Sequence, residues 1–257
     1  MKILAIGDVT SPRAAEYLSR SLWSFRKKEN IDLVIVNAEN ASFITGASAE
    51  IFDKLLYGGA DCITGGNHTM RNRSVYNYLD ESDKVIRPIN FGDSVPGRGY
   101  TILDAAGRRV MVINAMGTVH IEPVLNSPYE YIDKALLSER NNYDYAVLDI
   151  HAEATGEKLA IGYNYDGRIN IVFGTHTHVP TADCRILPEG TGYVTDVGMC
   201  GEDGGVLGID KDSVIVSMRT HMPPRFAPAG GETKADGVIF TLDKKSGRVT
   251  NIERVKI

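Results

Sequence analysis

Two histidines separated by a single residue are the first feature of this sequence that could do chemistry. His176 and His178 would project to the same face of an extended segment, because alternate side chains of a strand do so. Neutral imidazole is a common metal ligand, so the pair could present two imidazoles to one site. The alternative is a pair of strand-end histidines with unrelated hydrogen bonds, and the surrounding motifs decide between these interpretations.

A carboxamide and an imidazole stand side by side in the predicted turn at residues 65–69. Asparagine is an acceptable oxygen ligand for a hard or borderline cation, and adjacent side chains diverge. Asn67 could therefore bind a metal while His68 points across a substrate as a proton donor. The alternative is an asparagine that supports the turn by bonding its own backbone.

Two acidic positions follow strongly apolar stretches. The stretch before Glu39 and Asn40 is apolar enough for a strand buried on both faces, so a carboxylate at its end needs a partner. A metal is one such partner and an arginine is another, and the two oxygens of a carboxylate can bridge two cations. Asp8 invites the same interpretation, with the alternative that it caps the N-terminus of the following helix.

His151 lies in a motif that contains further acidic residues. Asp149 precedes it by two residues on the same face of the predicted strand, where it could orient the imidazole. The role of Glu153 is left open. The remaining histidines, His120 and His221, fall in predicted loops and are interpreted as surface residues.

All of these candidate ligands come after apolar stretches that predict β-strands. The stretches cover residues 2–6, 33–36, 62–64, 145–150 and 169–173. In an open α/β sheet the C-terminal ends of the strands share one edge, where ligands usually bind. The shared placement therefore favours one metal site over several unrelated motifs.

The combined set of candidate metal ligands consists of Asp8, Glu39, Asn40, Asn67, His151, His176 and His178. It offers carboxylate, carboxamide and imidazole groups but no thiolate, which points to iron, manganese or zinc rather than a structural zinc site. The set is too large for one ion. With Glu39 as a bridge it would hold two ions, and a pair about 3.5–4 Å apart can clamp a phosphoryl group.

Helical periodicity alternates with the predicted strands. The predicted helices cover residues 14–28, 49–56 and 128–137, and the predicted hairpins join 100–103 to 110–114 and 238–242 to 249–257. This alternation predicts an α/β fold with helices on the faces of a sheet, and the hairpins make its pairing mixed. The segments at 92–99 and 223–231 are typical of surface loops, so we expect one domain over residues 1–257.

Composition and charge narrow the functional classes. Hydrophobic residues make up 43% and charged residues 24% of the chain, which is typical of a globular protein with a substantial core. The net charge of -5 disfavours stable binding of long nucleic acid but leaves small anionic substrates open. No apolar stretch approaches the roughly 20 residues of a membrane helix, and the first residues turn polar too early for a signal peptide. We therefore expect a cytoplasmic protein that does not bind membranes.

The three cysteines, Cys62, Cys184 and Cys200, are widely spaced and form no CxxC pair. This pattern argues against a disulfide framework and against a thiolate metal site, so we expect reduced thiols. The sequence encodes no recognisable interface, and a homo-oligomer is left open.

Taken in order, the motifs resemble the calcineurin-like metallophosphoesterases, and most closely the YmdB-like branch of bacterial phosphodiesterases. The matching stretches span nearly the whole chain and are Asn-Ala-Glu-Asn at 37–40, Gly-Asn-His-Thr at 66–69, the motif at 151–160, Gly-Thr-His-Thr-His-Val at 174–179 and Thr-Asp-Val-Gly-Met at 195–199. The resemblance implies a four-layer α/β/β/α sandwich with mixed sheets, a dinuclear metal centre and hydrolysis of phosphodiesters. It also implies 2',3'-cyclic nucleotides as substrates.

The resemblance further implies a division of labour among the site residues. One metal would be surrounded by Asp8, Glu39, Asn40 and His178, and the other by Glu39, Asn67, His151 and His176. Iron is the favoured metal, with manganese or zinc as alternatives, and His68 would be the proton donor. The superfamily's usual histidine two residues after the first aspartate is replaced by Thr10, as in this branch. Met70 and the first loop, which lacks a usual glycine, depart from the branch and bear on substrate preference.

Three other functions remain as alternatives. A phosphomonoesterase could use the same metal centre, and a regulatory module could bind a nucleotide through its metals without turning it over. An oxidoreductase with a nucleotide cofactor would also explain the α/β pattern. No GxGxxG motif follows the first strand, however, which disfavours the oxidoreductase.

Overall fold

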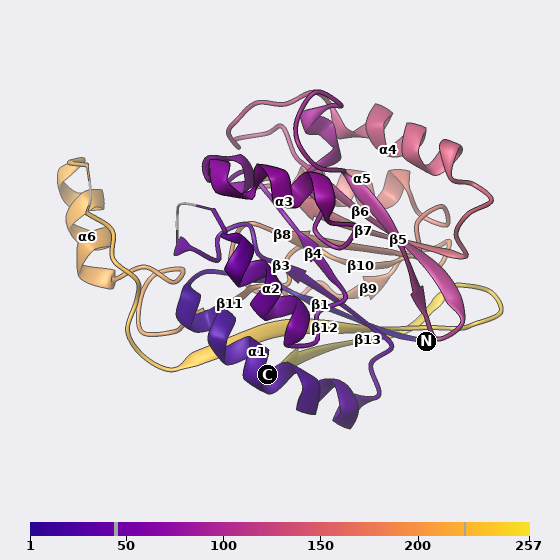
Figure 1. Ribbon diagram of the computed structural model, residues 1–257, viewed down its shortest axis with the longest axis horizontal. Helices are drawn as coiled ribbons and strands as arrows, with labels where there is room; N and C mark the ends of the chain where they lie inside the picture. The colour runs from indigo at the N-terminus through magenta and orange to yellow at the C-terminus, as the bar shows by residue number, and fades with distance from the viewer. Residues whose placement is uncertain (44–45, 224) are drawn as a thin grey trace.

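The computed structural model describes residues 1–43, 46–223 and 225–257. Two β-sheets are stacked face to face, and helices cover the outer face of each sheet (Figure 1). The α/β class and the four-layer α/β/β/α sandwich with mixed sheets are thereby confirmed.

The first sheet contains the strands from both ends of the chain. Its strands are β1 (Lys2–Ile6), β2 (Asp8–Val9), β3 (Leu33–Asn37), β4 (Cys62–Thr64), β11 (Met199–Glu202), β12 (Thr233–Leu242) and β13 (Val249–Lys256). β1 pairs in parallel with β3 and antiparallel with β12, and β3 pairs in parallel with β4. β12 and β13 form the predicted antiparallel pair. Consequently β1, β3 and β4 run in one direction and end on the same side of the sheet.

The second sheet is built from the middle of the chain. Its strands are β5 (Tyr100–Ala105), β6 (Arg108–Met116), β7 (Tyr145–His151), β8 (Ile171–Thr175), β9 (Arg185–Ile186) and β10 (Gly192–Val194). β5 and β6 form the predicted hairpin, while β6, β7, β8 and β10 are parallel neighbours. The carboxyl ends of β7 and β8 therefore lie side by side.

Six α-helices and three short 3-10 helices occur among the described residues. The α-helices are α1 (Pro12–Glu29), α2 (Ala49–Tyr57), α3 (Tyr76–Glu81), α4 (Pro128–Ser138), α5 (Thr155–Asn164) and α6 (Lys211–Thr220), and the 3-10 helices are η2 (Thr69–Arg71), η3 (Arg73–Val75) and η4 (Ile89–Phe91). α1 and α2 pack on the first sheet, whereas α4 and α5 pack on the second. α6 extends away from the sandwich (Figure 1).

Strands with apolar residues on both faces explain the layered core. Ile3 on β1 and Phe173 on β8 lie in the layer between the sheets, whereas Leu4 packs in the layer with α1 and α2. Leu148 on β7 packs in the layer with α4 and α5. All four side chains are fully buried, as expected for continuous apolar strands covered on both sides.

Some elements differ from the predictions. β8 begins later than the strand predicted at 169–173, because Ile169 lies in a turn and forms an isolated bridge with Asp166. α1 begins at Pro12 with Ser11 as its N-cap, so the alternative that Asp8 caps this helix is wrong. α3, α5, α6 and β9 to β11 have no predicted counterpart. Within the loop predicted at 223–231, residue 224 lies outside the described residues.

Two further observations concern location and thiols. No helix in the described ranges is long and apolar enough to cross a membrane. Cys62, Cys184 and Cys200 are all free, which agrees with the expected reduced thiols.

Candidate metal centre

The candidate ligands come from the carboxyl ends of strands in both sheets. Asp8 follows β1, Glu39 follows β3 and Asn67 follows β4, all in the first sheet. His151 is the last residue of β7, and His176 follows β8, both in the second sheet. The single edge expected from an open sheet is therefore replaced by two stacked sheets whose strand ends meet.

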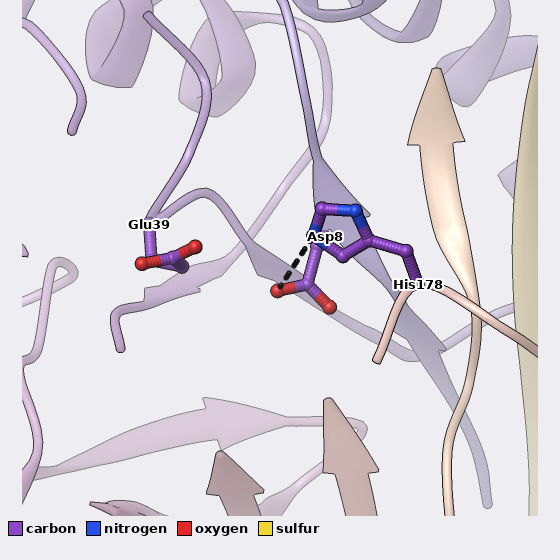
Figure 2. A group of neighbouring side chains, drawn as sticks. All are labelled: Asp8, Glu39 and His178. Atoms are coloured by element: carbon purple, nitrogen blue, oxygen red, sulfur yellow. Dashed lines mark ion pairs between the residues drawn. The ribbon is translucent and has the colours of Figure 1, made fainter. Parts of the chain in front are cut away.

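Three ligand groups form a first cluster beside the end of β1. One ligand atom from each of Asp8, Glu39 and His178 lies within 4.8 Å of the others. Figure 2 shows the Asp8 carboxylate next to the His178 imidazole, with Glu39 on a separate loop beside them. The Nε2 atom of His178 is 3.9 Å from Oδ1 of Asp8. Both carboxylates are almost completely buried, so this cluster concentrates negative charge in a place that water hardly reaches.

A second cluster is centred on the fully buried ring of His151. Its Nε2 atom lies 3.0 Å from Oδ1 of Asn67 and 3.2 Å from Nδ1 of His176. The Nδ1 atom of His151 is 3.7 Å from Oδ1 of Asp8, which places the two clusters next to each other. One oxygen and two nitrogen atoms thus converge, and this donor set suits a borderline divalent or trivalent cation.

The Asp8 carboxylate gives a structural test of whether a cation fits. Its Oδ2 accepts a hydrogen bond from the backbone N–H of His176, but its buried Oδ1 has no hydrogen-bond partner among the described residues. Burial, reinforced by the neighbouring carboxylates of Asp196 and Glu39, raises the pKa of Asp8 well above its ordinary value. A buried charge without a partner is costly, and a cation would remove that cost. The residues present therefore fit a metal ion.

The imidazoles of His178 and His176 each have an oxygen atom next to the ring nitrogen that points away from the cluster. Nδ1 of His178 donates to the carbonyl oxygen of Leu207 at 3.1 Å, and Nε2 of His176 is 3.1 Å from Oε2 of Glu153. Burial lowers the pKa of His151 well below its ordinary value and also lowers the pKa of His176. Neutral imidazoles oriented from behind are the form in which histidine binds metals.

His176 and His178 do not lie in an extended segment. His176 has a φ of 100° and His178 a φ of 62°, so the backbone turns sharply through both residues. Their side chains consequently enter different clusters instead of sharing one face. The assumption of an extended segment is therefore wrong, although both rings do reach the site.

His68 lies beside the first cluster rather than inside it. Its Nδ1 atom is 2.9 Å from Oδ1 of Asn40 and 3.3 Å from Oε1 of Glu39, while its backbone N–H donates to Oε2 of Glu39 at 2.7 Å. Asn40 thus faces His68. Asn67 points instead to His151, so the two neighbours in the turn diverge as the sequence predicts.

A buried ion pair supports the histidine loop, and its role could not be inferred from the sequence. Nζ of Lys158 lies 2.8 Å from Oδ2 of Asp196 and donates to the backbone carbonyl of Thr175, with both charged side chains fully buried. The same Asp196 oxygen accepts the backbone N–H of Thr177. The pair therefore holds the strained loop between β8 and β9 against α5. Lys158 and Asp196 lie in the motifs at 151–160 and 195–199, but nothing in the spacing of these motifs indicates that the two side chains are in contact.

Thr10 differs from the usual superfamily residue and Met70 from the usual branch residue, and both contact parts of the fold other than the ligands. Thr10 is buried and donates from Oγ1 to the carbonyl oxygen of Cys200. Met70 packs against the core layer that contains α1 and α2.

Glycines one or two residues before the ligands allow the strand ends to approach one another closely. A Cβ atom at Gly7 would lie 2.0 Å from the carbonyl oxygen of Gly198, and one at Gly174 would lie 1.9 Å from that of Thr195. At Gly66 it would lie 2.4 Å from Nε2 of His151. No side chain fits at these distances, so glycine is required where the chains cross.

The Gly66→Ala variant is expected to disturb the second cluster directly. The new methyl group would press on a fully buried ring, so we expect a loss of about 1–3 kcal/mol in the free energy of unfolding and weaker metal binding. Gly156→Ala in α5 is the matched control, because a Cβ there meets nothing within 4 Å and alanine favours the helix by about 0.5–1 kcal/mol. Urea unfolding measures both. A Gly66→Ala protein as stable as the wild type would show that the close approach is unimportant.

Comparisons with known proteins agree with this geometry. The family model described as "YmdB-like protein" matches residues 4–255. A 2',3'-cyclic-nucleotide 2'-phosphodiesterase of Bacillus subtilis (strain 168) is 39% identical over 257 residues, covering 100% of this chain and 97% of that protein.

Two solved structures are similar over the whole chain. A hypothetical protein from Thermus thermophilus has 34% identity and a TM-score of 0.91, covering 100% of this chain and 99% of that one. A novel phosphatase from Mycoplasma pneumoniae has 31% identity and a TM-score of 0.92, covering 100% of this chain and 93% of that one. The chain therefore belongs to the YmdB-like family of metallophosphoesterase-type proteins.

Proposed function

We propose that this phosphoesterase uses two metal ions to hydrolyse small phosphodiesters, with 2',3'-cyclic nucleotides as the preferred class. The observation that carries the proposal is the pair of adjacent ligand clusters around the partnerless Oδ1 atom of Asp8, within the part of the chain that the structure describes. The activity for which the Bacillus subtilis relative is named, that of a 2',3'-cyclic-nucleotide 2'-phosphodiesterase, supports the substrate class.

The two clusters support an assignment of the ligands. Asp8, Glu39 and His178 would hold one ion, and Asn67, His151 and His176 the other. The resemblance adds Asn40, whose Oδ1 lies 2.9 Å from Nδ1 of His68, to the first ion and makes Glu39 the bridge between the two. Iron is the metal we favour, with manganese or zinc as alternatives, because the donor set is oxygen and nitrogen. When bound, such ions supply Lewis acidity and lower the pKa of coordinated water.

His68 is the residue we assign to proton transfer. Its Nδ1 is held between Asn40 and Glu39, so the ring has a fixed orientation and Nε2 is the nitrogen that would donate a proton to the departing ribose oxygen. Its side chain is 15% exposed, so the ring is accessible at the edge of the site.

A substrate panel tests the proposed function. Purified protein containing its metals is given 2',3'-cyclic AMP, 3',5'-cyclic AMP and 3'-AMP at equal concentrations, and kcat/KM is compared. We expect the 2',3'-cyclic diester to be preferred over the monoester by at least about tenfold, which is about 1.4 kcal/mol of transition-state binding. A preference for 3'-AMP would identify a phosphomonoesterase instead. Binding of the nucleotides without any turnover would favour the regulatory alternative.

A further inference from the structure

A fully buried polar network lies behind the His151 ring, on the side away from Asn67. Oδ1 of Asp149 accepts a hydrogen bond from the hydroxyl of Thr175 at 2.7 Å. Oδ2 of Asp149 accepts from Thr64 at 2.5 Å and from the Asn37 amide at 3.0 Å. Oγ1 of Thr175 is in turn 2.9 Å from Nδ1 of His151. Asp149, which the sequence suggested could orient the imidazole, thus reaches His151 through a threonine.

The chemistry of the network sets the direction of its hydrogen bonds. Three donors converge on Asp149, an arrangement that suits an ionised carboxylate, which can only accept. A threonine hydroxyl has a single hydrogen, and that of Thr175 is used by Asp149. Only its lone pairs then face His151, so the contact at 2.9 Å requires the proton to be on Nδ1 of the imidazole.

The opposite nitrogen of His151 has competing acceptors. Nε2 lies 3.0 Å from the Asn67 side-chain oxygen and 3.2 Å from Nδ1 of His176, and either atom could accept a hydrogen bond from a proton there. A neutral imidazole carries only one proton, so the two sides of the ring compete for it. Which nitrogen carries the proton therefore depends on the Thr175 hydroxyl next to Nδ1.

We propose that Thr175 and Asp149 are positioning residues that keep the proton of His151 on Nδ1 and leave Nε2 bare to bind a metal. This inference rests on the proposed metal centre. The hydroxyl and the carboxylate are not among the proposed ligands, and they act through the imidazole. In metal-binding histidines, the hydrogen-bond partner of one ring nitrogen decides which nitrogen can bind the metal. Here that partner would be a threonine hydroxyl.

The Thr175→Val variant removes the hydroxyl while keeping the shape of the side chain. The tautomer of His151 is read from two-bond ¹H–¹⁵N correlation spectra of the metal-free protein, and manganese binding is measured by titration. We expect the proton on Nδ1 in the wild type and on Nε2 in Thr175→Val, with manganese bound about 10–100-fold more weakly at one of two sites. Thr175→Ser should restore both properties, which loss of packing alone would not allow.

The Asp149→Asn variant tests the same network without removing an atom from the core. The new amide would keep its oxygen toward the Asn37 donor and turn its N–H toward Thr175. The hydroxyl of Thr175 would then rotate and donate to His151, which moves the imidazole proton to Nε2. Thr64→Val is the matched control, because it removes a hydroxyl that donates to the same Asp149 carboxylate but does not contact the His151 ring. We expect it to leave the tautomer unchanged.

The outcomes separate this inference from the proposed function. A wild-type His151 with its proton on Nε2, or a Thr175→Val protein with the wild-type tautomer and affinity, would overturn the positioning role. A wild-type protein that binds no manganese, iron or zinc would overturn the metal centre, even where the tautomer proves to be set by Thr175.

Discussion

Replacing His68 by alanine is expected to lower kcat on a 2',3'-cyclic nucleotide by about 10²–10⁴-fold, the usual contribution of general acid catalysis. The metal content should stay near that of the wild type, because His68 lies beside the ligand clusters and its backbone N–H still donates to Glu39. Steady-state kinetics and elemental analysis of the same preparation check both parts. The change should fall on kcat more than on KM.

The control for His68 is a histidine remote from the clusters. His221→Asn changes an exposed residue at the end of α6, in a left-handed conformation that asparagine tolerates. We expect it to retain wild-type turnover. If His68→Ala loses its metals together with its activity, His68 is a ligand or a support of Glu39, and the assignment of proton donor fails.

Replacing Asp8 by asparagine is expected to separate stability from function. The variant should lose metal and at least about 10²-fold in turnover, since metal ions contribute several kcal/mol of transition-state stabilisation. The metal-free variant should nevertheless be about 1–3 kcal/mol more stable than the metal-free wild type at pH 8, because a buried carboxylate oxygen without a partner among the described residues is removed. Urea unfolding in the presence of a chelator measures the second effect.

The pH dependence of this stability has a definite sign. Burial raises the folded-state pKa of Asp8 above the unfolded-state value, so folding favours the protonated form. The metal-free wild type should therefore lose stability as pH rises from the unfolded-state pKa of Asp8 to its folded-state pKa. The Asp8→Asn variant should lose less stability over the same pH range. Asp104→Asn, the same change at an exposed position of β5, should alter neither slope nor stability. An equal dependence of stability on pH in Asp8→Asn and the wild type would show that burial does not disfavour the charged form of Asp8.

The fold could be predicted because its strands are short, apolar and buried on both faces. Residues 33–36 are hydrophobic and completely buried, and the ligands that follow such stretches lie where the strands end. The polarity change at each strand end is a local signal that marks Glu39, Asn67 and His151 as candidates. Each signal is weak alone, and the shared placement after strands is what favours one site. Their roles as metal ligands remain predictions.

Other parts of the site depend on tertiary contacts without a local signal. Lys158 and Asp196 form a buried pair across 38 positions, and Thr175 matters through a hydroxyl that any buried threonine carries. The backbone at His176 and His178 has positive φ angles, whereas the sequence pattern predicted an extended strand there. This conformation has no local signal in the sequence. α6 was missed because Val216 and Met218 remain exposed there, so its apolar residues trace no buried face.

In the proposed function, turnover requires two metal ions per chain. The most direct measurement adds manganese in steps to chelator-treated, dialysed protein and follows hydrolysis of 2',3'-cyclic AMP at each step. The two clusters predict negligible turnover without metal and a plateau at two ions per chain. Full turnover by the metal-free protein, or a plateau at one ion per chain, would contradict the dinuclear centre.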